Sequence, residues 1–201
     1  MEIKLKIAIG MPTNRGIKPK TVLSLLRIID TTKYDFHFIV ASEGYTIAEN
    51  RIYIATQALK AKCDYLLFID DDMVFPENTL TQLLSHKKDV VGVVAHSRAL
   101  PLMPVVEFFD EQEVSLTDRL MGNWNIPKVL FKVKMVGGGV VLIDLKVFEK
   151  IEKPWFFMTQ HEFGMTKMGE DAWFCKQVRE KDMEIWCDPT LSIGHIGDYV
   201  F

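Results

Sequence analysis

The order of strand-like and helix-like segments in the first half of the chain is its most constraining feature. Four short apolar segments have the length and composition of buried strands: residues 6–10, 36–40, 65–69 and 89–95. Segments with apolar residues at helical spacing separate them, beginning near Pro19, Thr46 and Pro76. Thr46 and Glu49 have the spacing of a capping box. Strand–helix alternation of this kind builds a parallel sheet with helices on its faces. The sequence therefore predicts an α/β fold with a doubly wound, mainly parallel sheet.

The second half of the chain, from Arg98 onward, is less regular. Strand-like pieces at residues 105–109 and 130–136 are followed by three glycines and an apolar strand at residues 140–143. A loop rich in glycine, methionine and aromatic residues, 154–169, then leads into a helix predicted from Glu170 to about Lys181. No linker-like or low-complexity segment interrupts the chain. We therefore expect one domain over residues 1–201 with an elaborated second half. The 154–169 loop is a candidate lid that would order when a ligand binds.

Charge and cysteine content exclude several classes of protein. The formal net charge is −3, from 24 basic and 27 acidic residues, so no overall positive field favours nucleic acid. Three cysteines without a CxxC pair argue against a disulfide framework or a zinc ribbon and favour a reducing compartment. The sequence contains no run of about 20 apolar residues and no signal-peptide pattern at its start. We therefore expect a cytoplasmic protein without a transmembrane segment.

The acidic triplet Asp70-Asp71-Asp72 directly follows the third predicted strand. Ligands of doubly wound sheets bind at the carboxyl ends of the strands, where this triplet falls. Extended backbone would point Asp70 and Asp72 to one side and Asp71 to the other. Two carboxylates at short range favour a cation between them, and Mg²⁺ or Mn²⁺ also keeps positions for phosphate oxygens. The alternative is a solvated acidic turn before a helix, but the preceding buried strand favours a metal–diphosphate site.

Three residues nearer the end of the chain are further candidates for chemistry. Glu170 and Asp171 fall in the first turn of a predicted helix, where the helix dipole alone would stabilise them. A carboxylate there could also accept the proton of an attacking hydroxyl, and the spacing leaves both interpretations open. His195 lies in a segment with glycine at positions 194 and 197, and its imidazole could complete a carboxylate-bound Mn²⁺ site, although a lone histidine is more often structural.

Glycine-rich and basic motifs give weaker signals. Residues 10–18 contain G-x5-G-x-K, which does not match the Walker A spacing, and the glycines at 137–139 do not open a GxGxxG motif. Four basic residues could face a phosphate or simply be solvated: Arg15, Lys18, Lys20 and Arg51.

In its order of motifs the chain resembles the nucleotide-sugar glycosyltransferases of the GT-A (Rossmann-like) fold, especially family 2 and its Anp1-like relatives. The resemblance covers nearly the whole chain and rests on these segments: Pro12-Thr13, 48–51 (AENR), 64–72 (DYLLFIDDD), 137–143 (GGGVVLI), 169–174 (GEDAWF), Asp188-Pro189 and His195. The DxD element alone is weakly specific, whereas DxD followed by GED and a late histidine is specific. Ser42-Glu43-Gly44 differs from the family, in which an aspartate often follows the second strand.

The resemblance implies a role for each matching residue. The residues implied in donor binding are Pro12, Thr13, Glu43, Arg51, Asp70 and Asp71. Asp72, with Asp70 and His195, would hold Mn²⁺ or Mg²⁺. Asp171 would be the base of an inverting transfer, and Glu170 would hold the acceptor or the loop. Residues of about 1–100 would bind the nucleotide of a UDP- or GDP-sugar, and those of about 101–201 a glycan, lipid-linked or other hydroxyl acceptor.

Three other functions share parts of this pattern. A sugar-nucleotide nucleotidyltransferase usually carries a glycine-rich basic loop after its first strand, which residues 11–16 match only in part. A non-catalytic nucleotide- or glycan-binding module could keep the scaffold and would bind a donor without turnover. A HAD-like phosphotransferase also uses DxD, but after its first strand, whereas here the triplet follows the third. The resemblance therefore implies a metal-dependent glycosyltransferase more strongly than any of these three.

Overall fold

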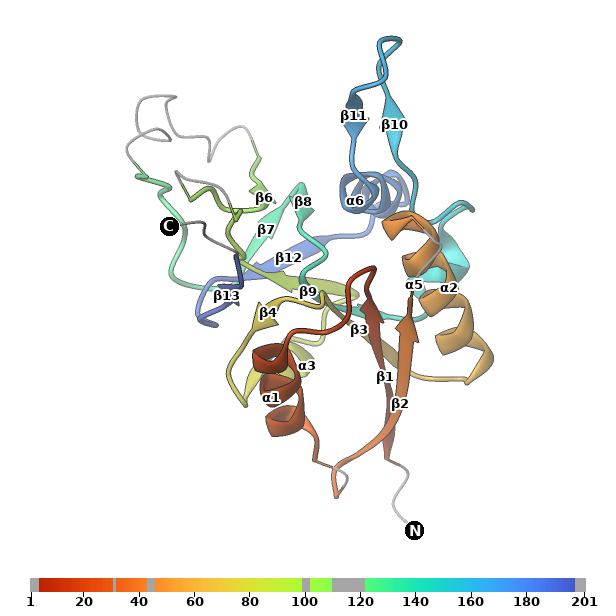
Figure 1. The fold of residues 1–201 in the computed structure, drawn as a ribbon, viewed down its shortest axis with the longest axis vertical. Helices are drawn as coiled ribbons and strands as arrows, with labels where there is room; N and C mark the ends of the chain where they lie inside the picture. The colour runs from red at the N-terminus through yellow and green to blue at the C-terminus, as the bar shows by residue number, and fades with distance from the viewer. Residues whose placement is uncertain (1–3, 31, 43–45, 99–101, 110–121, 198–201) are drawn as a thin grey trace.

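The computed structural model describes residues 4–30, 32–42, 46–98, 102–109 and 122–197. A seven-stranded sheet runs through it in the order β2-β1-β3-β9-β5-β12-β7. Its strands are β1 (Leu5–Pro12), β2 (Tyr34–Ala41), β3 (Tyr65–Ile69), β5 (Val90–Val93), β7 (Phe131–Val133), β9 (Val140–Asp144) and β12 (Ile185–Asp188). The strands predicted from apolar runs in the first half are all present (Figure 1).

The sheet is mostly parallel, as predicted, but its strand order differs from a simple parallel arrangement. β1 pairs in parallel with β2 and β3, and β5 pairs in parallel with β12. β9 lies between β3 and β5 and is antiparallel to both, and β7 is antiparallel to β12. The amide of Asp70, at the end of β3, donates to the carbonyl of Gly139 at 2.9 Å. β9 therefore begins beside the end of β3. A strand that pairs with β3 from this point has to run antiparallel to it.

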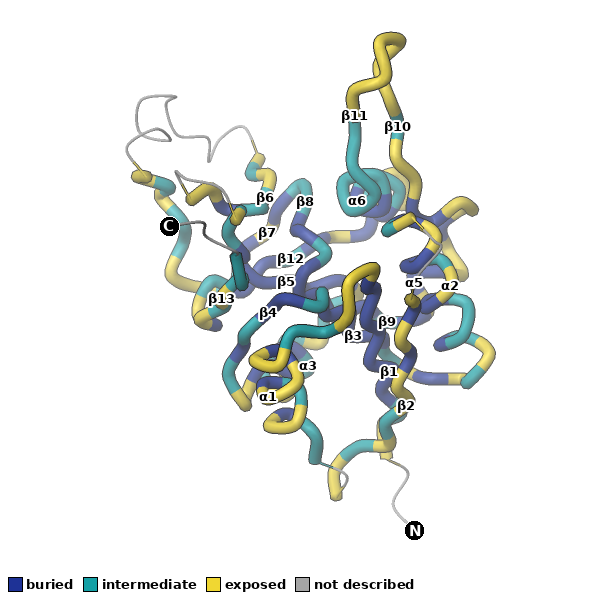
Figure 2. Tube along the Cα trace, in the orientation of Figure 1, coloured by how far each residue is buried: buried dark blue, intermediate teal, exposed yellow. Residues whose placement is uncertain are grey.

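Helices pack on both faces of the sheet. α1 (Pro19–Ile28) and α3 (Thr79–Ser85) contribute Ile28, Leu80 and Leu83 to one apolar core. α2 (Ile47–Lys60), α5 (Val147–Lys150) and α6 (Glu170–Glu180) contribute to the core on the other face, where the side chains of Ile54 and Phe174 are buried. Figure 2 shows the buried strands between these two layers. No helix among the described residues combines the length and apolarity needed to cross a bilayer.

The start of α2 follows the predicted capping pattern. The Thr46 side chain accepts from the amide of Glu49 at 3.3 Å, and the Glu49 carboxylate accepts from the amide of Thr46 at 3.0 Å. Each bond satisfies a main-chain donor that the first helical turn leaves unpaired. This capping box fixes where α2 begins, one turn before the buried Arg51.

Three two-stranded sheets complete the fold. They are β4 (Met73–Val74) with β13 (Gly194–His195), β6 (Val106–Glu107) with β8 (Met135–Val136), and β10 (Thr159–Gln160) with β11 (Thr166–Met168). The strand predicted at 130–136 is split between β7 and β8, because the amide of Lys134 donates to the carbonyl of Glu107 and turns the chain toward β6. The predicted 154–169 loop contains the β10–β11 hairpin, which stands out from the body (Figure 1).

Candidate functional site

The acidic triplet lies at the carboxyl end of β3, as predicted, but it forms a turn instead of extended chain. The turn gives the three carboxylates three different partners: Asp70 Oδ1 lies 2.8 Å from Arg51 Nη2, Asp71 Oδ2 accepts from Thr13 Oγ1 at 2.5 Å, and Asp72 Oδ2 lies 2.8 Å from Arg98 Nη1. The expectation that Asp70 and Asp72 converge through strand alternation is therefore wrong. The triplet instead ties helix α2 to the loops that follow β1 and β5.

Arg51 is the centre of a buried group that we call the Arg51 cluster: Arg51, Asp70, Gly138 and Glu170. The Arg51 residue is 2% exposed. Its Nε lies 3.3 Å from Glu170 Oε1, and its Nη1 donates to the Gly138 carbonyl at 3.3 Å. A Cβ at position 138 would lie 2.3 Å from Arg51 Nη2, so only glycine allows this approach. The cluster joins the turn after β3 to the first turn of α6.

These contacts give Arg51 different partners from those expected. Its guanidinium is occupied by protein oxygens and also lies over the Phe68 ring, 5.1 Å from the centroid, where a phosphate could not reach it without rearrangement. Burial opposes its charge, but Asp70 and Glu170 raise the pKa of Arg51 and keep it protonated. Burial raises the pKa of Glu170, and the Arg51 charge offsets only part of that effect. One cation therefore neutralises more than one carboxylate here.

Asp72 belongs to a second group, the Asp72 cluster: Asp72, His96, Arg98 and His195. β13 pairs antiparallel with β4 and sets His195 opposite Met73, next to Asp72 in sequence. His195 Nε2 lies 3.1 Å from Asp72 Oδ1, while Nδ1 lies 2.8 Å from the His96 carbonyl oxygen. A carbonyl can only accept, so Nδ1 carries a proton and the lone pair of the neutral ring is on Nε2, facing Asp72.

Protonation couples the members of the Asp72 cluster. The hydrogen bond to Asp72 raises the pKa of His195, against the opposing effect of burial. Burial by itself would raise the pKa of Asp72, but the hydrogen bond and charge of His195, with the charge of Arg98, lower it below its ordinary value. A proton on Nε2 and the exposed Arg98 thus neutralise a carboxylate that is itself nearly inaccessible.

The donor chemistry of Asp72 and His195 fits a divalent metal ion. Among the described residues, no group of three or more histidine, cysteine, aspartate or glutamate side chains converges as a ready metal site. Asp72 and His195 supply one carboxylate oxygen and one imidazole nitrogen, a pair that suits Mn²⁺ better than Ca²⁺. The His96 carbonyl orients the imidazole as the outer partners of metal-bound histidines do.

The expected nucleoside-binding residues lie at the end of β1. Pro12 is the last residue of the strand, and Thr13, 6% exposed, accepts from the amide of Gly16 at 2.9 Å while donating to Asp71. The amide of Lys18 donates to the Asp71 carbonyl at 2.8 Å. The loop after β1 is thereby fastened to the acidic turn. Glu43 lies outside the described residues.

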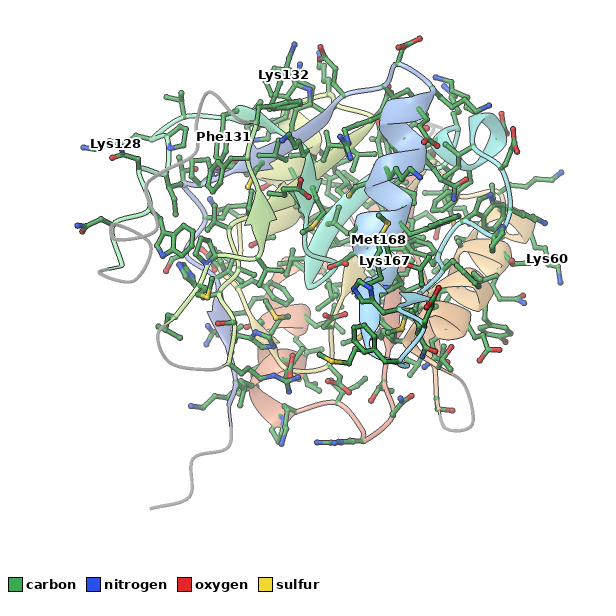
Figure 3. All side chains as sticks on the ribbon, turned by 90° about the horizontal axis from the view of Figure 1, so that it is seen from above. Lys60, Lys128, Phe131, Lys132, Lys167 and Met168 are labelled. Atoms are coloured by element: carbon green, nitrogen blue, oxygen red, sulfur yellow. The ribbon has the colours of Figure 1, made fainter. Side chains whose placement is uncertain are left out.

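Asp171 lies in the first turn of α6, directly after Glu170. Its Oδ1 accepts from the amide of Ala172 at 2.7 Å, and the side chain is half-buried. Seen from above, Lys167 and Met168 of β11 lie at the end of α6 where this turn begins (Figure 3). The β10–β11 hairpin therefore ends directly before Glu170 and Asp171, so a movement of the hairpin would displace both residues.

His96 and Arg98 are site residues that the sequence analysis did not single out. Both follow β5, whose carboxyl end is at the same edge of the sheet as that of β3, since β3 and β5 are each antiparallel to β9. The rule that placed the acidic triplet at this edge applies equally to residues after β5. That rule was the signal that could have found them.

No family model and no curated protein matches the sequence. The fold is similar to the crystal structure of A197 from STIV, with a TM-score of 0.66 and 18% identity over 96% of this chain and 86% of that one. It is also similar to GalNAc-T7 crystallised with UDP, GalNAc and Mn²⁺, with a TM-score of 0.55 and 11% identity. That match covers 96% of this chain and 43% of GalNAc-T7. At these identities the likeness concerns the fold, which resembles that of a GT-A glycosyltransferase.

Proposed function

We propose that the protein is a metal-dependent glycosyltransferase of the GT-A type, related to family 2 and the Anp1-like enzymes. It would move a sugar from a nucleoside-diphosphate donor, UDP- or GDP-linked, to a hydroxyl of a glycan or a lipid-linked acceptor. The observation that carries the proposal is the contact of His195 Nε2 with Asp72 Oδ1, 3.1 Å apart, at the carboxyl edge of the sheet. It pairs the residue types expected for Mn²⁺ at the edge where such sheets bind nucleotides.

Asp72 and His195 would hold Mn²⁺ or Mg²⁺, with diphosphate oxygens and water completing the coordination. When bound, the ion neutralises negative charge on the departing nucleoside diphosphate. Arg98 would exchange its contact with Asp72 for the diphosphate, because its side chain is 57% exposed and free to turn. Asp70, whose Oδ1 is held by Arg51, keeps 29% of its side chain exposed and would receive a ribose hydroxyl with its other oxygen.

Asp171 would act as the base of an inverting transfer. The acceptor oxygen forms a bond to the anomeric carbon while the bond from that carbon to the diphosphate oxygen breaks, and the hydroxyl proton passes to the Asp171 carboxylate. The electron pair of the broken bond leaves with the nucleoside diphosphate. Glu170, bonded to Arg51, would fix the first turn of α6 so that the neighbouring carboxylate meets the acceptor.

Calorimetry and product analysis on two variants test the proposal. Wild-type protein is titrated with UDP and with GDP, each with and without Mn²⁺. We expect metal-dependent binding of one nucleotide, its loss in Asp72→Ala, and its retention in Asp171→Asn. Transfer from the matching nucleotide-sugar should fall at least about 10³-fold in Asp171→Asn, within the range for removal of a general base or nucleophile activator.

The outcomes also separate the other functions. Release of pyrophosphate when a nucleoside triphosphate and a sugar 1-phosphate are supplied in place of the nucleotide-sugar would indicate a nucleotidyltransferase. Nucleotide binding without turnover across a panel of glycan and lipid-linked glycan acceptors would indicate a binding module. A nucleotide affinity that changes neither with Mn²⁺ nor in Asp72→Ala would contradict the proposal.

A further inference from the structure

Strand β2 forms an apolar edge of the central sheet, away from the acidic turn. Among the described residues, β2 pairs with β1 and with no other strand. Phe38 and Val40 are each 49% exposed, unusual for aromatic and branched side chains in a strand of eight residues. Phe36 stacks on Phe38 with ring centroids 6.1 Å apart, and Tyr34 meets Phe36 edge-on at 6.0 Å. A ladder of aromatic rings thus follows an uncovered edge.

The main-chain groups along this edge are available for pairing. The carbonyl of Ala41 accepts from Thr13, the residue after β1, so the odd-numbered residues of β2 direct their main-chain groups toward β1. These groups alternate in direction along a strand. The even-numbered residues Phe36 and Phe38 therefore direct both their amide and their carbonyl toward the free edge. A long apolar edge of this kind is a template for another strand.

The sequence of β2 is complementary to itself when read in the opposite direction. With Phe36 opposite Phe36 of a second copy, the register sets Asp35 opposite His37, and Tyr34 opposite Phe38. Asp35 and His37 are exposed on the face away from the aromatic ladder, so each copy offers an acid and an imidazole to the other. A register with His37 at the axis would bring two imidazoles together and lose both of these pairs.

We propose that two copies of this chain associate through antiparallel pairing of their β2 strands about a two-fold axis at Phe36, giving one continuous sheet of fourteen strands. The arrangement pairs the main-chain groups of Phe36 across the axis and the Phe38 amide with the Tyr34 carbonyl, while the Tyr34 amide keeps its bond to the Asp30 carbonyl. It also continues the aromatic ladder across the axis and forms two Asp35–His37 pairs. A single patch that contacts itself closes as a dimer and stops there. The acidic turn takes no part in the contact.

Light scattering after size exclusion measures the assembly of the full chain. We expect twice the 23.1-kDa chain mass at tens of micromolar. Phe38→Lys should give a monomer, whereas Phe163→Lys, the same change at a 73% exposed residue of the β10–β11 hairpin, should leave the dimer intact. Asp35→Lys should raise the dissociation constant of the dimer at least tenfold. The double exchange of Asp35→His with His37→Asp should restore the wild-type dissociation constant. Monomeric wild-type protein at these concentrations would overturn the proposal.

Disulfide formation tests the register. Phe36→Cys sets two thiols opposite each other across the axis, where paired Cα atoms about 5.5 Å apart lie within disulfide range. The three native cysteines are buried, so wild-type protein should stay unlinked in diamide. We expect Phe36→Cys to form a covalent dimer at least tenfold faster than His37→Cys. The opposite order would overturn the proposed register, and equal slow rates would overturn the pairing.

Discussion

The Arg51 cluster and the Asp72 cluster begin from the same three-residue turn but differ in their access to solvent. The Arg51 side chain is 3% exposed, whereas the Arg98 side chain is 57% exposed. Desolvated charges hold one arrangement, because separating them leaves a charge buried without a partner. An exposed pair exchanges partners at small cost. One acidic turn therefore combines a fixed support with a group that can release its cation to a ligand.

The largest effect should come from removing the cation of the Arg51 cluster. Arg51→Met keeps much of the side-chain volume but leaves Asp70 and Glu170 without their partner. We expect the free energy of unfolding to fall by about 3–5 kcal/mol, as when one member of a buried ion pair is lost. Urea denaturation measures this. Arg98→Met is the matched control, and equal losses in the two variants would remove the distinction between the clusters.

A smaller effect concerns the pH dependence of the Arg51 cluster. Burial raises the pKa of Glu170 in the folded protein above that of the unfolded chain. Its contribution to stability is therefore complete below the unfolded value, near 4.5, and is lost as the pH rises through the folded value.

Glu170→Gln removes this titration. Relative to that variant, the wild-type free energy of unfolding should decline with rising pH, by about 1.4 kcal/mol for each unit by which the two pKa values differ. Denaturation at a series of pH values from 4 to 8 measures the trend. A wild-type free energy of unfolding that rises with pH relative to that of Glu170→Gln would contradict the assignment.

The smallest effect should come from a change in the Asp72 cluster. Arg98→Ala removes an exposed partner of Asp72, so we expect a stability loss within about 1 kcal/mol. The same change frees Asp72 Oδ2 and removes a positive charge. Mn²⁺ without nucleotide should then bind roughly fivefold more tightly, which corresponds to about 1 kcal/mol. Calorimetry measures this change, and weaker Mn²⁺ binding would indicate that Arg98 supports the site instead of competing for it.

The fold was predictable where local pattern decides it. The apolar run Tyr65–Ile69 and the capping box at Thr46 each depend on a few neighbouring residues, and both predictions are confirmed. The place of β9 depends on which strand edge it reaches, which is set by contacts far apart in sequence. β4 and β13 have two residues each, too few for any periodicity to show. Their pairing, which brings His195 to Asp72, could not be predicted for that reason.

The site could be predicted by residue type better than by contact. Asp72 and His195 were both singled out from the sequence, and the structure brings them together. For Arg51 the sequence left two interpretations open, a phosphate ligand or a solvated side chain, and arginine usually remains at the surface. However, Arg51 follows Ala48 by three residues and precedes Ala55 by four, a spacing that places it on the buried side of α2. That spacing could have indicated a structural cation.

The position of β9 determines how the two halves of the chain depend on each other. β9 comes from the second half yet pairs with both β3 and β5 of the first. A fragment ending near residue 100 would therefore lack the strand that joins its own sheet, and two apolar strand edges would face water. During synthesis the amino-terminal strands must wait for residues 140–144 to leave the ribosome before the sheet can close. The first half of the chain is thus no independent module, and recombination that exchanges the halves would have to preserve the pairing of β9 with β3 and β5.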